Sequence, residues 1–217
     1  MIPPPPTYPA RPVNGGPLHL ARPKSVGLGG SPWYYEPKFN GWRALVHVPT
    51  GAMFNRKLER LTIEREFAPS LAVLHNSPFV WLDCEALERR HGLGRGSLIV
   101  LDAVATETGY NLHQQDYRRR HDLLGKYFLG LGLEFLEPET ITPGRAFLCP
   151  HIEDAGTGSP GGELVLQLWN ELKMANARLN CPFYEGVVAK RADSLYPIQL
   201  RSPEIEFPFW VKHRWAF

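Results

Sequence analysis

One lysine, Lys38, stands in a segment whose residue types could perform chemistry on a phosphate. It lies in EPKFNGWR at positions 36–43. A lysine amine has an ordinary pKa near ~10.4, so burial or neighbouring cations must remove its proton before it can attack. Gly41 lets the backbone approach a ligand closely, and Arg43 adds a permanent cation beside the lysine. This spacing is expected of a lysine that attacks a nucleotide phosphate. For the segment taken alone, the alternative is a solvated lysine in a surface turn.

Two carboxylates stand close together in VWLDCEAL at positions 80–87. Alternation along a strand puts Asp83 and Glu85 on the same face. Two carboxylates side by side repel each other unless a cation, a sugar hydroxyl or a metal meets them. They therefore indicate a binding site, with a sheet face open to water as the alternative.

Bases recur near the C-terminal end of the sequence. The segment EGVVAKR at 185–191 begins with an acid and ends with two bases, and WVKHR at 210–214 places Lys212 and Arg214 on one strand face. A phosphate bound among four cations would account for these charges: Lys38, Lys190, Lys212 and Arg214.

Short β-branched or aromatic runs, bounded by turn residues, predict strands at residues 44–48, 79–82, 98–101 and 186–189. A helix is expected to begin at Asp116 as its N-cap and to bury Leu123, Leu124, Tyr127 and Phe128. A second helix, at about 163–179, would bury Leu164, Val165, Leu168, Trp169, Leu172 and Ala175. Strands dominate and do not alternate regularly with helices, so the sequence predicts an α+β fold with largely antiparallel sheets.

The first 30 residues differ from the rest in composition. They hold many of the 21 prolines, including the run Pro3–Pro6, and end in a glycine-rich join at Gly27–Gly30. We expect a stiff, passive arm over residues 1–30 and one domain over residues 31–217, with a docking peptide for a proline-reading domain as the alternative role of the arm. The segment Ala155–Gly162 is predicted to be a mobile surface loop.

Composition excludes several classes of protein. With 43% hydrophobic residues, 21% charged residues and a net charge of +2, the chain is ordinary for a globular protein, and nucleic-acid binding would require a local basic patch. Three cysteines without a CxxC pair, Cys84, Cys149 and Cys181, argue for a reducing compartment and against a disulfide framework or zinc site. Without a long apolar run or a signal peptide, we expect a cytoplasmic protein with no membrane partner.

The order and type of the charged segments resemble the adenylation domain of ATP-dependent DNA ligases of bacterial type, a family of covalent nucleotidyltransferases. The match covers most of the chain and rests on five motifs in order. They are LARP at 20–23 with YEPKFNGWRAL at 35–45, FNRK at 54–57 with Leu61-Thr62, LDCE at 82–85 with IVLD at 99–102, EGVVAKR at 185–191 with ADSLY at 192–196, and WVK at 210–212.

The resemblance implies an ATP-grasp-like covalent nucleotidyltransferase domain, with antiparallel sheets flanked by helices. It implies that Lys38 attacks the α-phosphate of ATP, releases pyrophosphate and holds AMP through a phosphoramidate. The AMP would then pass to the 5′-phosphate at a nick, and the 3′-hydroxyl would displace it. The implied cofactors are ATP and Mg²⁺, and the implied partner is nicked or broken DNA.

By the same resemblance, five residues would bind the nucleotide: Glu36, Arg43, Glu85, Lys190 and Lys212. Glu36 would read the adenine edge and Glu85 would meet the ribose. Glu85 and Glu185 would place Mg²⁺, while Lys190 and Lys212 would neutralise charge that develops on the phosphate. Arg56 and Arg214 would contact the nucleic acid.

The sequence departs from the family pattern at three residues: Asn40 replaces the usual aspartate, Leu101 an aromatic residue, and Arg214 the second lysine of the fifth motif. It stops at Phe217, where typical ligases continue into an OB-fold domain. We therefore expect slow, salt-sensitive sealing by the chain alone and a partner protein that supplies the missing clamp. An RNA ligase or RNA-end adenylyltransferase, and a nick-binding module that has lost catalysis, remain alternatives.

Overall fold

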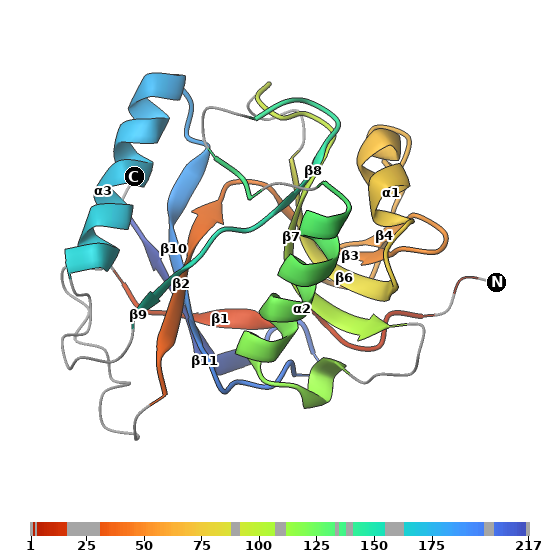
Figure 1. The fold of residues 1–217 in the computed structure, drawn as a ribbon, viewed down its shortest axis with the longest axis horizontal. Coiled ribbons are helices and arrows are strands. Elements are labelled where there is room, and N and C mark those ends of the chain that lie inside the picture. The colour runs from red at the N-terminus through yellow and green to blue at the C-terminus, as the bar shows by residue number, and fades with distance from the viewer. Residues whose placement is uncertain are drawn as a thin grey trace. The chain divides into compact units, whose positions relative to one another are not determined.

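A computed structural model describes residue 2 and residues 4–16, 31–87, 92–106, 112–132, 135–137, 141–154, 163–197 and 202–215. The segment Leu20–Pro23, the join at Gly27–Gly30 and the loop predicted at Ala155–Gly162 lie outside the described residues. The chain forms two compact units. Unit 1 consists of Met1–Ala10, Gly41–Cys149 and Leu195–Ile205, and unit 2 of Arg11–Asn40, Pro150–Ser194 and Glu206–Phe217. Each unit has its own sheet, and strands and helices are mixed as the sequence predicts (Figure 1).

The sheet of unit 1 has six strands in the order β5-β4-β3-β6-β7-β8. Their bounds are β3 Trp42–His47, β4 Ala52–Phe54, β5 Arg60–Leu61, β6 Phe79–Leu87, β7 Ser97–Thr106 and β8 Ala146–Leu148. All neighbours are antiparallel except β7 and β8. The strands predicted at 44–48, 79–82 and 98–101 are confirmed as β3, β6 and β7.

Two α-helices, α1 (Ala68–Leu74) and α2 (Tyr117–Gly130), pack on β7 and β8 of this sheet. The predicted N-cap of α2 is confirmed, because the Asp116 carboxylate accepts a 2.8 Å hydrogen bond from the Arg119 N–H. Leu124 and Phe128 enter the core with strand residues of the sheet. The burial predicted for Tyr127 is wrong, since 42% of its surface is exposed. A short 3-10 helix at Leu112–Gln114 precedes α2.

The sheet of unit 2 has five strands in the order β1-β11-β10-β2-β9. Their bounds are β1 Arg11–Asn14, β2 Trp33–Phe39, β9 Ile152–Asp154, β10 Tyr184–Arg191 and β11 Glu206–Arg214. Its one helix among the described residues, α3 (Glu163–Leu179), runs beside β10 and also packs on β2 and β9 (Figure 1). The predicted strand at 186–189 and the predicted helix are confirmed. Val165, Trp169, Leu172 and Ala175 are buried, whereas Leu164 is 60% exposed, contrary to prediction.

The proline-rich segment contains ordered contacts within both units. Thr7 is buried in unit 1, and its hydroxyl donates a 2.8 Å hydrogen bond to the Pro197 carbonyl. In unit 2, β1 pairs in parallel with β11, and Pro12 fits there because β1 is an edge strand that tolerates a missing N–H. The described part of residues 1–30 thus contributes to the fold.

Among the described residues, no helix has the length and apolar character needed to cross a membrane.

Candidate active site

Strand register brings the charged residues of unit 2 to one face of its sheet. Lys38 in β2 lies opposite Gly186 in β10, and Gly186 lies opposite Arg214 in β11. In the next row, Glu36 lies opposite Val188, which lies opposite Lys212. Directly paired residues point to the same side of a sheet. The prediction that Lys212 and Arg214 share a face is therefore confirmed, and Glu36 and Lys38 are on that face too.

Glu185 reaches this face because β10 contains a bulge. Tyr184 pairs with Phe39 and Gly186 with Lys38, so Glu185 is an extra residue without a partner in the β2 register. A bulge of this kind re-aims a side chain that alternation would send to the other face. Gly186 has φ 148°, and a Cβ there would lie 1.9 Å from the His213 carbonyl oxygen, so only glycine fits. The glycine after the acid is thus explained by backbone geometry.

Lys38 and Arg214 both pair with the bulged carboxylate. The Lys38 ammonium donates to Glu185 in a short ion pair and also lies 3.4 Å from the Phe39 carbonyl. A guanidinium nitrogen of Arg214 lies 3.2 Å from the same Glu185 oxygen. The side chains of Lys38 and Glu185 are only 18% and 15% exposed. The proposed nucleophile is therefore partly buried and already held by an acid.

Lys212 is the cation of this face without a close acidic partner: we find no ion pair for it within 4.0 Å among the described residues. Burial and the neighbouring charges of Arg214, Arg11 and Lys38 lower the pKa of Lys212 below its usual value, against the opposing effect of Glu206. Like charges raise the cost of keeping Lys212 protonated, and an anion would offset that cost. The arrangement suits a phosphate.

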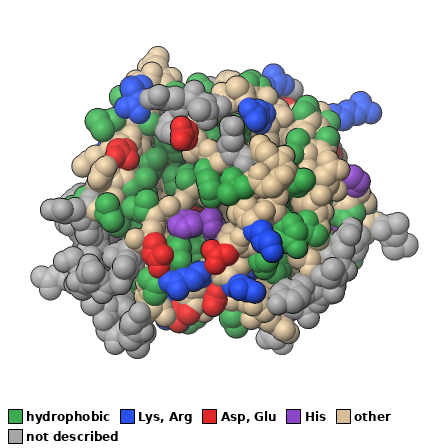
Figure 2. Space-filling model, in the orientation of Figure 1, with side chains coloured by type: hydrophobic (Ala, Val, Ile, Leu, Met, Phe, Trp, Pro, Cys, Tyr) green, Lys and Arg blue, Asp and Glu red, His purple; other side chains and the backbone are tan. Residues whose placement is uncertain are grey.

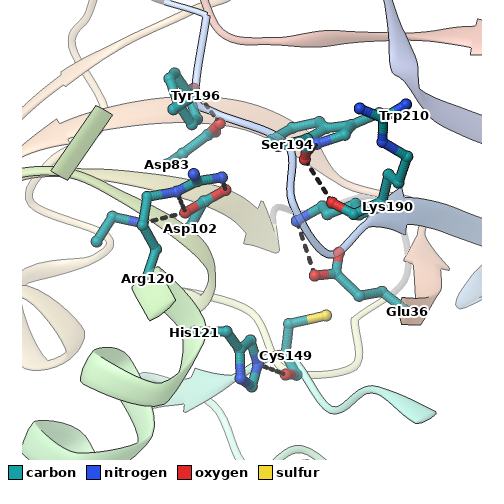
Figure 3. Close-up of polar contacts among 12 residues, drawn as sticks. Glu36, Asp83, Asp102, Arg120, His121, Cys149, Lys190, Ser194, Tyr196 and Trp210 are labelled. Carbon is teal, nitrogen blue, oxygen red and sulfur yellow. Dashed lines mark hydrogen bonds and ion pairs between the residues drawn. The ribbon is translucent and has the colours of Figure 1, made fainter. Parts of the chain in front are cut away.

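Lys190 does not stand open on this face. Its Nζ lies 2.7 Å from Glu36 Oε1, and both side chains are almost completely buried (Figure 3). The ammonium also lies 4.5 Å from the ring centroid of Trp210, whose indole N–H donates to the Ser194 hydroxyl over 3.1 Å. Contact of Lys190 with a nucleotide phosphate stays a prediction. Its observed contact holds Glu36 in place.

Asn40, the residue that departs from the motif's usual aspartate, follows the end of β2. Its side-chain amide donates a 3.0 Å hydrogen bond to the Pro182 carbonyl, and its backbone N–H donates to Phe183. An aspartate could not donate the first of these bonds. The asparagine therefore has a structural role that aspartate would not supply.

In unit 1, Arg43 and Asp83 form a bidentate ion pair between β3 and β6. Asp83 is completely buried and also accepts a hydrogen bond from the Tyr196 hydroxyl. Arg43 remains 21% exposed. The predicted cation that meets the carboxylate pair is thus Arg43, and the alternative of an open sheet face is wrong for Asp83.

Glu85 anchors the turn that follows the lysine strand. Its Oε1 accepts a 3.0 Å hydrogen bond from the Gly41 N–H. A Cβ at position 41 would lie 2.7 Å from the Ala86 carbonyl oxygen and 2.9 Å from Glu85 Cγ, so glycine is required by close packing. The ribose and metal contacts of Glu85 stay predictions.

Sequence reasoning assigned no role to Tyr196, Asp102 or Arg120. The last two form a fully buried bidentate pair, with nitrogen–oxygen distances of 2.7 and 2.9 Å (Figure 3). In the sequence, Asp102 is only the last residue of the IVLD segment, and Arg120 is a single arginine in a predicted helix. Neither pattern predicts that the two residues form a buried ion pair. Arg56 is exposed and 3.5 Å from Glu204, so its contact with nucleic acid stays a prediction.

Among the described residues, no group of three or more His, Cys, Asp or Glu side chains could hold a metal ion. On the face shown in Figure 2, basic and acidic side chains lie next to one another. Because the described residues form no cluster of metal ligands, the predicted Mg²⁺ positions at Glu85 and Glu185 rest on single carboxylates, one in each unit.

Comparison with known proteins gives matches to solved structures. No protein-family model and no curated protein matches the chain. The ligase domain of M. tuberculosis LigD matches with TM-score 0.59 and 19% identity over 96% of this chain and 59% of that one. A mycobacterial DNA ligase D complexed with ATP and MES matches with TM-score 0.59 and 20% identity over 95% of this chain and 60% of that one. Chlorella virus DNA ligase-adenylate matches with TM-score 0.55 and 13% identity over 94% of this chain and 67% of that one.

These matches confirm the predicted fold. The chain has the fold of the adenylation domain of ATP-dependent DNA ligases, as the five motifs indicated. It spans about three fifths of the two mycobacterial chains.

Proposed function

We propose that this chain is the adenylation part of an ATP-dependent polynucleotide ligase that acts on DNA. Lys38 forms a covalent lysyl-AMP, and the AMP then passes to a 5′-phosphate at a nick or break. The observation that carries the proposal is the charged face of unit 2, where Lys38 lies in register with Arg214 and beside Glu185, next to a row that contains Lys212. This face occurs in a fold shared with DNA ligases.

The first step needs a neutral amine at Lys38. The ammonium must give up one proton before attack and a second as the phosphorus–nitrogen bond forms, while the bond to the β-phosphate oxygen breaks and pyrophosphate leaves. Glu185 is the carboxylate in contact with Nζ and can accept the first proton from it, and the second proton passes to solvent water as the phosphorus–nitrogen bond forms. Lys212 and Arg214 present positive charge to the phosphate oxygens, where negative charge grows during displacement.

The residues present also fit a magnesium ion. Mg²⁺ is usually bound by one or two carboxylates together with substrate phosphates, so a cage of protein ligands is not required. Glu185 would hold the ion on the charged face of unit 2, and Glu85 is a candidate in unit 1. Bound there, Mg²⁺ would withdraw electron density from the phosphate oxygens.

In this proposal, Glu36 and Arg43 would recognise the nucleotide. Glu36, kept in place by Lys190, would accept hydrogen bonds from the amino group of adenine. Arg43 would donate to the sugar or a phosphate. A mycobacterial ligase of the same fold is complexed with ATP, and the Chlorella virus ligase is an adenylate, which supports ATP as the nucleotide.

Covalent labelling tests the proposal. The protein is incubated with ATP labelled at the α-phosphate and with Mg²⁺, and label on the protein is measured in a denaturing gel. We expect labelling that Lys38→Ala abolishes and that Lys38→Arg also abolishes, because a guanidinium with pKa above ~12 is never a neutral nucleophile. Lys126→Ala, at an exposed position of α2, is the control and should label normally.

Transfer is measured with the labelled protein. Nicked duplexes with DNA or RNA at the 5′-phosphate strand are added, and label is followed from protein to nucleic acid. Transfer to the DNA nick supports the proposal, and transfer confined to RNA favours the RNA-ligase alternative. Labelling that survives in Lys38→Ala would overturn the assignment.

A further inference from the structure

The chain that follows β10 is held in unit 1 at three consecutive residues. Leu195 forms an antiparallel bridge with Asp116, the N-cap of α2. Pro197 accepts the hydrogen bond from the Thr7 hydroxyl. Between them, the Tyr196 side chain is only 2% exposed. This connection therefore inserts one aromatic side chain into the interior of unit 1.

Tyr196 joins two ion pairs there. Its hydroxyl donates to Asp83, the carboxylate that is bidentate with Arg43. The guanidinium of Arg120 lies over its ring, 5.7 Å from the ring centroid, and Arg120 is itself bidentate with the buried Asp102 (Figure 3). The ring and the hydroxyl thus contact different members of one continuous polar network.

Within this network, only Arg43 extends to the surface. The side chains of Asp83, Asp102 and Arg120 are 0% exposed, whereas Arg43 is 21% exposed. A buried carboxylate needs several hydrogen-bond donors. Arg43 donates to both oxygens of Asp83, and the Tyr196 hydroxyl is a further donor to that carboxylate. Burial and the charge of Asp83 raise the pKa of Tyr196 well above its usual value, so the phenol keeps its proton and remains a donor.

We propose that Tyr196 is a positioning residue: its hydroxyl fixes Asp83, and Asp83 fixes the direction in which Arg43 presents its guanidinium to the nucleotide. This inference rests on the proposed function only in assigning Arg43 to the nucleotide. Tyr196 itself acts through Asp83 and does not touch substrate. Tyr196 is the second residue of the unit 1 segment that begins at Leu195, and its partner Asp83 is 113 residues away in sequence, so this role is not evident from motif spacing.

A double-mutant cycle tests the route through Arg43. Tyr196→Phe removes the hydroxyl and keeps the ring over Arg120. We expect it to lower kcat/KM for labelling by ATP roughly 10-fold, the effect of losing one hydrogen bond to a charged group. In an Arg43→Ala background the same change should cost nothing further. Tyr127→Phe, at the exposed tyrosine of α2, should leave the rate unchanged in both backgrounds. Equal loss from Tyr196→Phe in both backgrounds would overturn the inference.

A second measurement does not depend on catalysis. Hydrogen exchange of the arginine Nε–H groups is followed by NMR, with Arg43→Lys used to identify the Arg43 signal. We expect Tyr196→Phe to speed exchange at Arg43 roughly 10-fold, because the hydrogen-bonded partner of this group is loosened, and Tyr127→Phe to have no effect. A protein that never labels but shows this change refutes the proposed function and keeps the positioning role. An Arg43 signal that Tyr196→Phe leaves unchanged refutes the positioning role, whatever the labelling result.

Discussion

Lys190 and Glu36 form an ion pair across β10 and β2 whose nitrogen–oxygen distance is 2.7 Å and whose side chains are 3% and 2% exposed. Removing both charges from water is costly, and their mutual attraction offsets that cost only while both are present. The indole of Trp210, 4.5 Å from the ammonium, adds a favourable cation–π contact. The pair therefore couples the stability of unit 2 to the position of Glu36.

Breaking this pair on one side should destabilise the protein. Lys190→Met leaves Glu36 buried without its cation, and we expect the free energy of unfolding to fall by about 3–5 kcal/mol. Denaturant titration measures this loss. In the double variant Lys190→Met/Glu36→Gln, most of the stability should return because no charge remains buried. A Lys190→Met protein that is as stable as the wild type but no longer labels with ATP would instead assign Lys190 to the phosphate.

Strand alternation and motif order predict much of the candidate site. Alternation puts Lys212 and Arg214 on one face, and the register of β10 and β11 confirms it. It also puts Asp83 and Glu85 together, and β6 pairs regularly with β3 at these positions. These predictions succeed where the strands are regularly paired, because a period of two residues is a local property of an extended backbone.

Other parts of the site depend on contacts that no local pattern records. Glu185 joins the charged face only through a bulge, and one extra residue leaves no trace in the spacing of EGVVAKR. Tyr196 and Asp83 are 113 residues apart in sequence, so their hydrogen bond could not be inferred from either motif. The strand at Arg11–Asn14 was not predicted because it contains Pro12, which an edge strand tolerates.

In two helices, the hydrophobic stripe in the sequence predicted burial of a residue that is exposed in the structure. In α2, Leu124 and Phe128 occupy the inward positions, which leaves Tyr127 at the margin with its ring nearly perpendicular to that of Phe79. In α3, Leu164 lies in the first turn and is mostly exposed. A hydrophobic stripe shows which side of a helix faces the core, but it does not show how far around the helix the buried positions extend.

Loss of the carboxylate at Glu185 should slow lysyl-AMP formation. Glu185→Gln keeps the size of the side chain but removes the charge that holds Lys38 and would bind Mg²⁺, so we expect the labelling rate to fall on the order of 10²-fold. The rate is measured at saturating ATP and Mg²⁺. Glu171→Gln, on the exposed side of α3, is the matched control and should label at the wild-type rate. An unchanged rate in Glu185→Gln would leave Glu185 with a structural role only.

Two glycine-to-alanine changes should affect stability with opposite signs. A Cβ at Gly41 would meet the Ala86 carbonyl at 2.7 Å, so Gly41→Ala forces backbone apart and should cost about 1–3 kcal/mol. At Gly125, inside α2, a Cβ meets nothing within 4 Å. Gly125→Ala should therefore stabilise the protein by about 0.5–1 kcal/mol through helix propensity. Thermal unfolding of both variants checks the signs, and a neutral Gly41→Ala would show that the turn can move away from β6.

Acid should destabilise the protein through His213. Burial lowers the pKa of His213 below its usual 6.5, although its hydrogen bond with the Gly16 carbonyl opposes the shift. Since the unfolded chain then takes up a proton at higher pH than the folded chain, stability rises with pH across this interval. It is lost as pH falls from about 6.5 toward the folded pKa, with a slope of at most about 1.4 kcal/mol per pH unit from this one group.

Unfolding free energies measured at several values between about pH 5 and pH 8 provide the test of this dependence. His213→Gln cannot take up a proton but keeps an amide donor for the Gly16 carbonyl, so the slope below neutral pH should become shallower. Burial also lowers the pKa of His47, and the slope that remains should be reduced further by His47→Gln. If His213→Gln unfolds with the same pH dependence as the wild type, His213 takes up its proton equally in both states and contributes nothing to acid sensitivity.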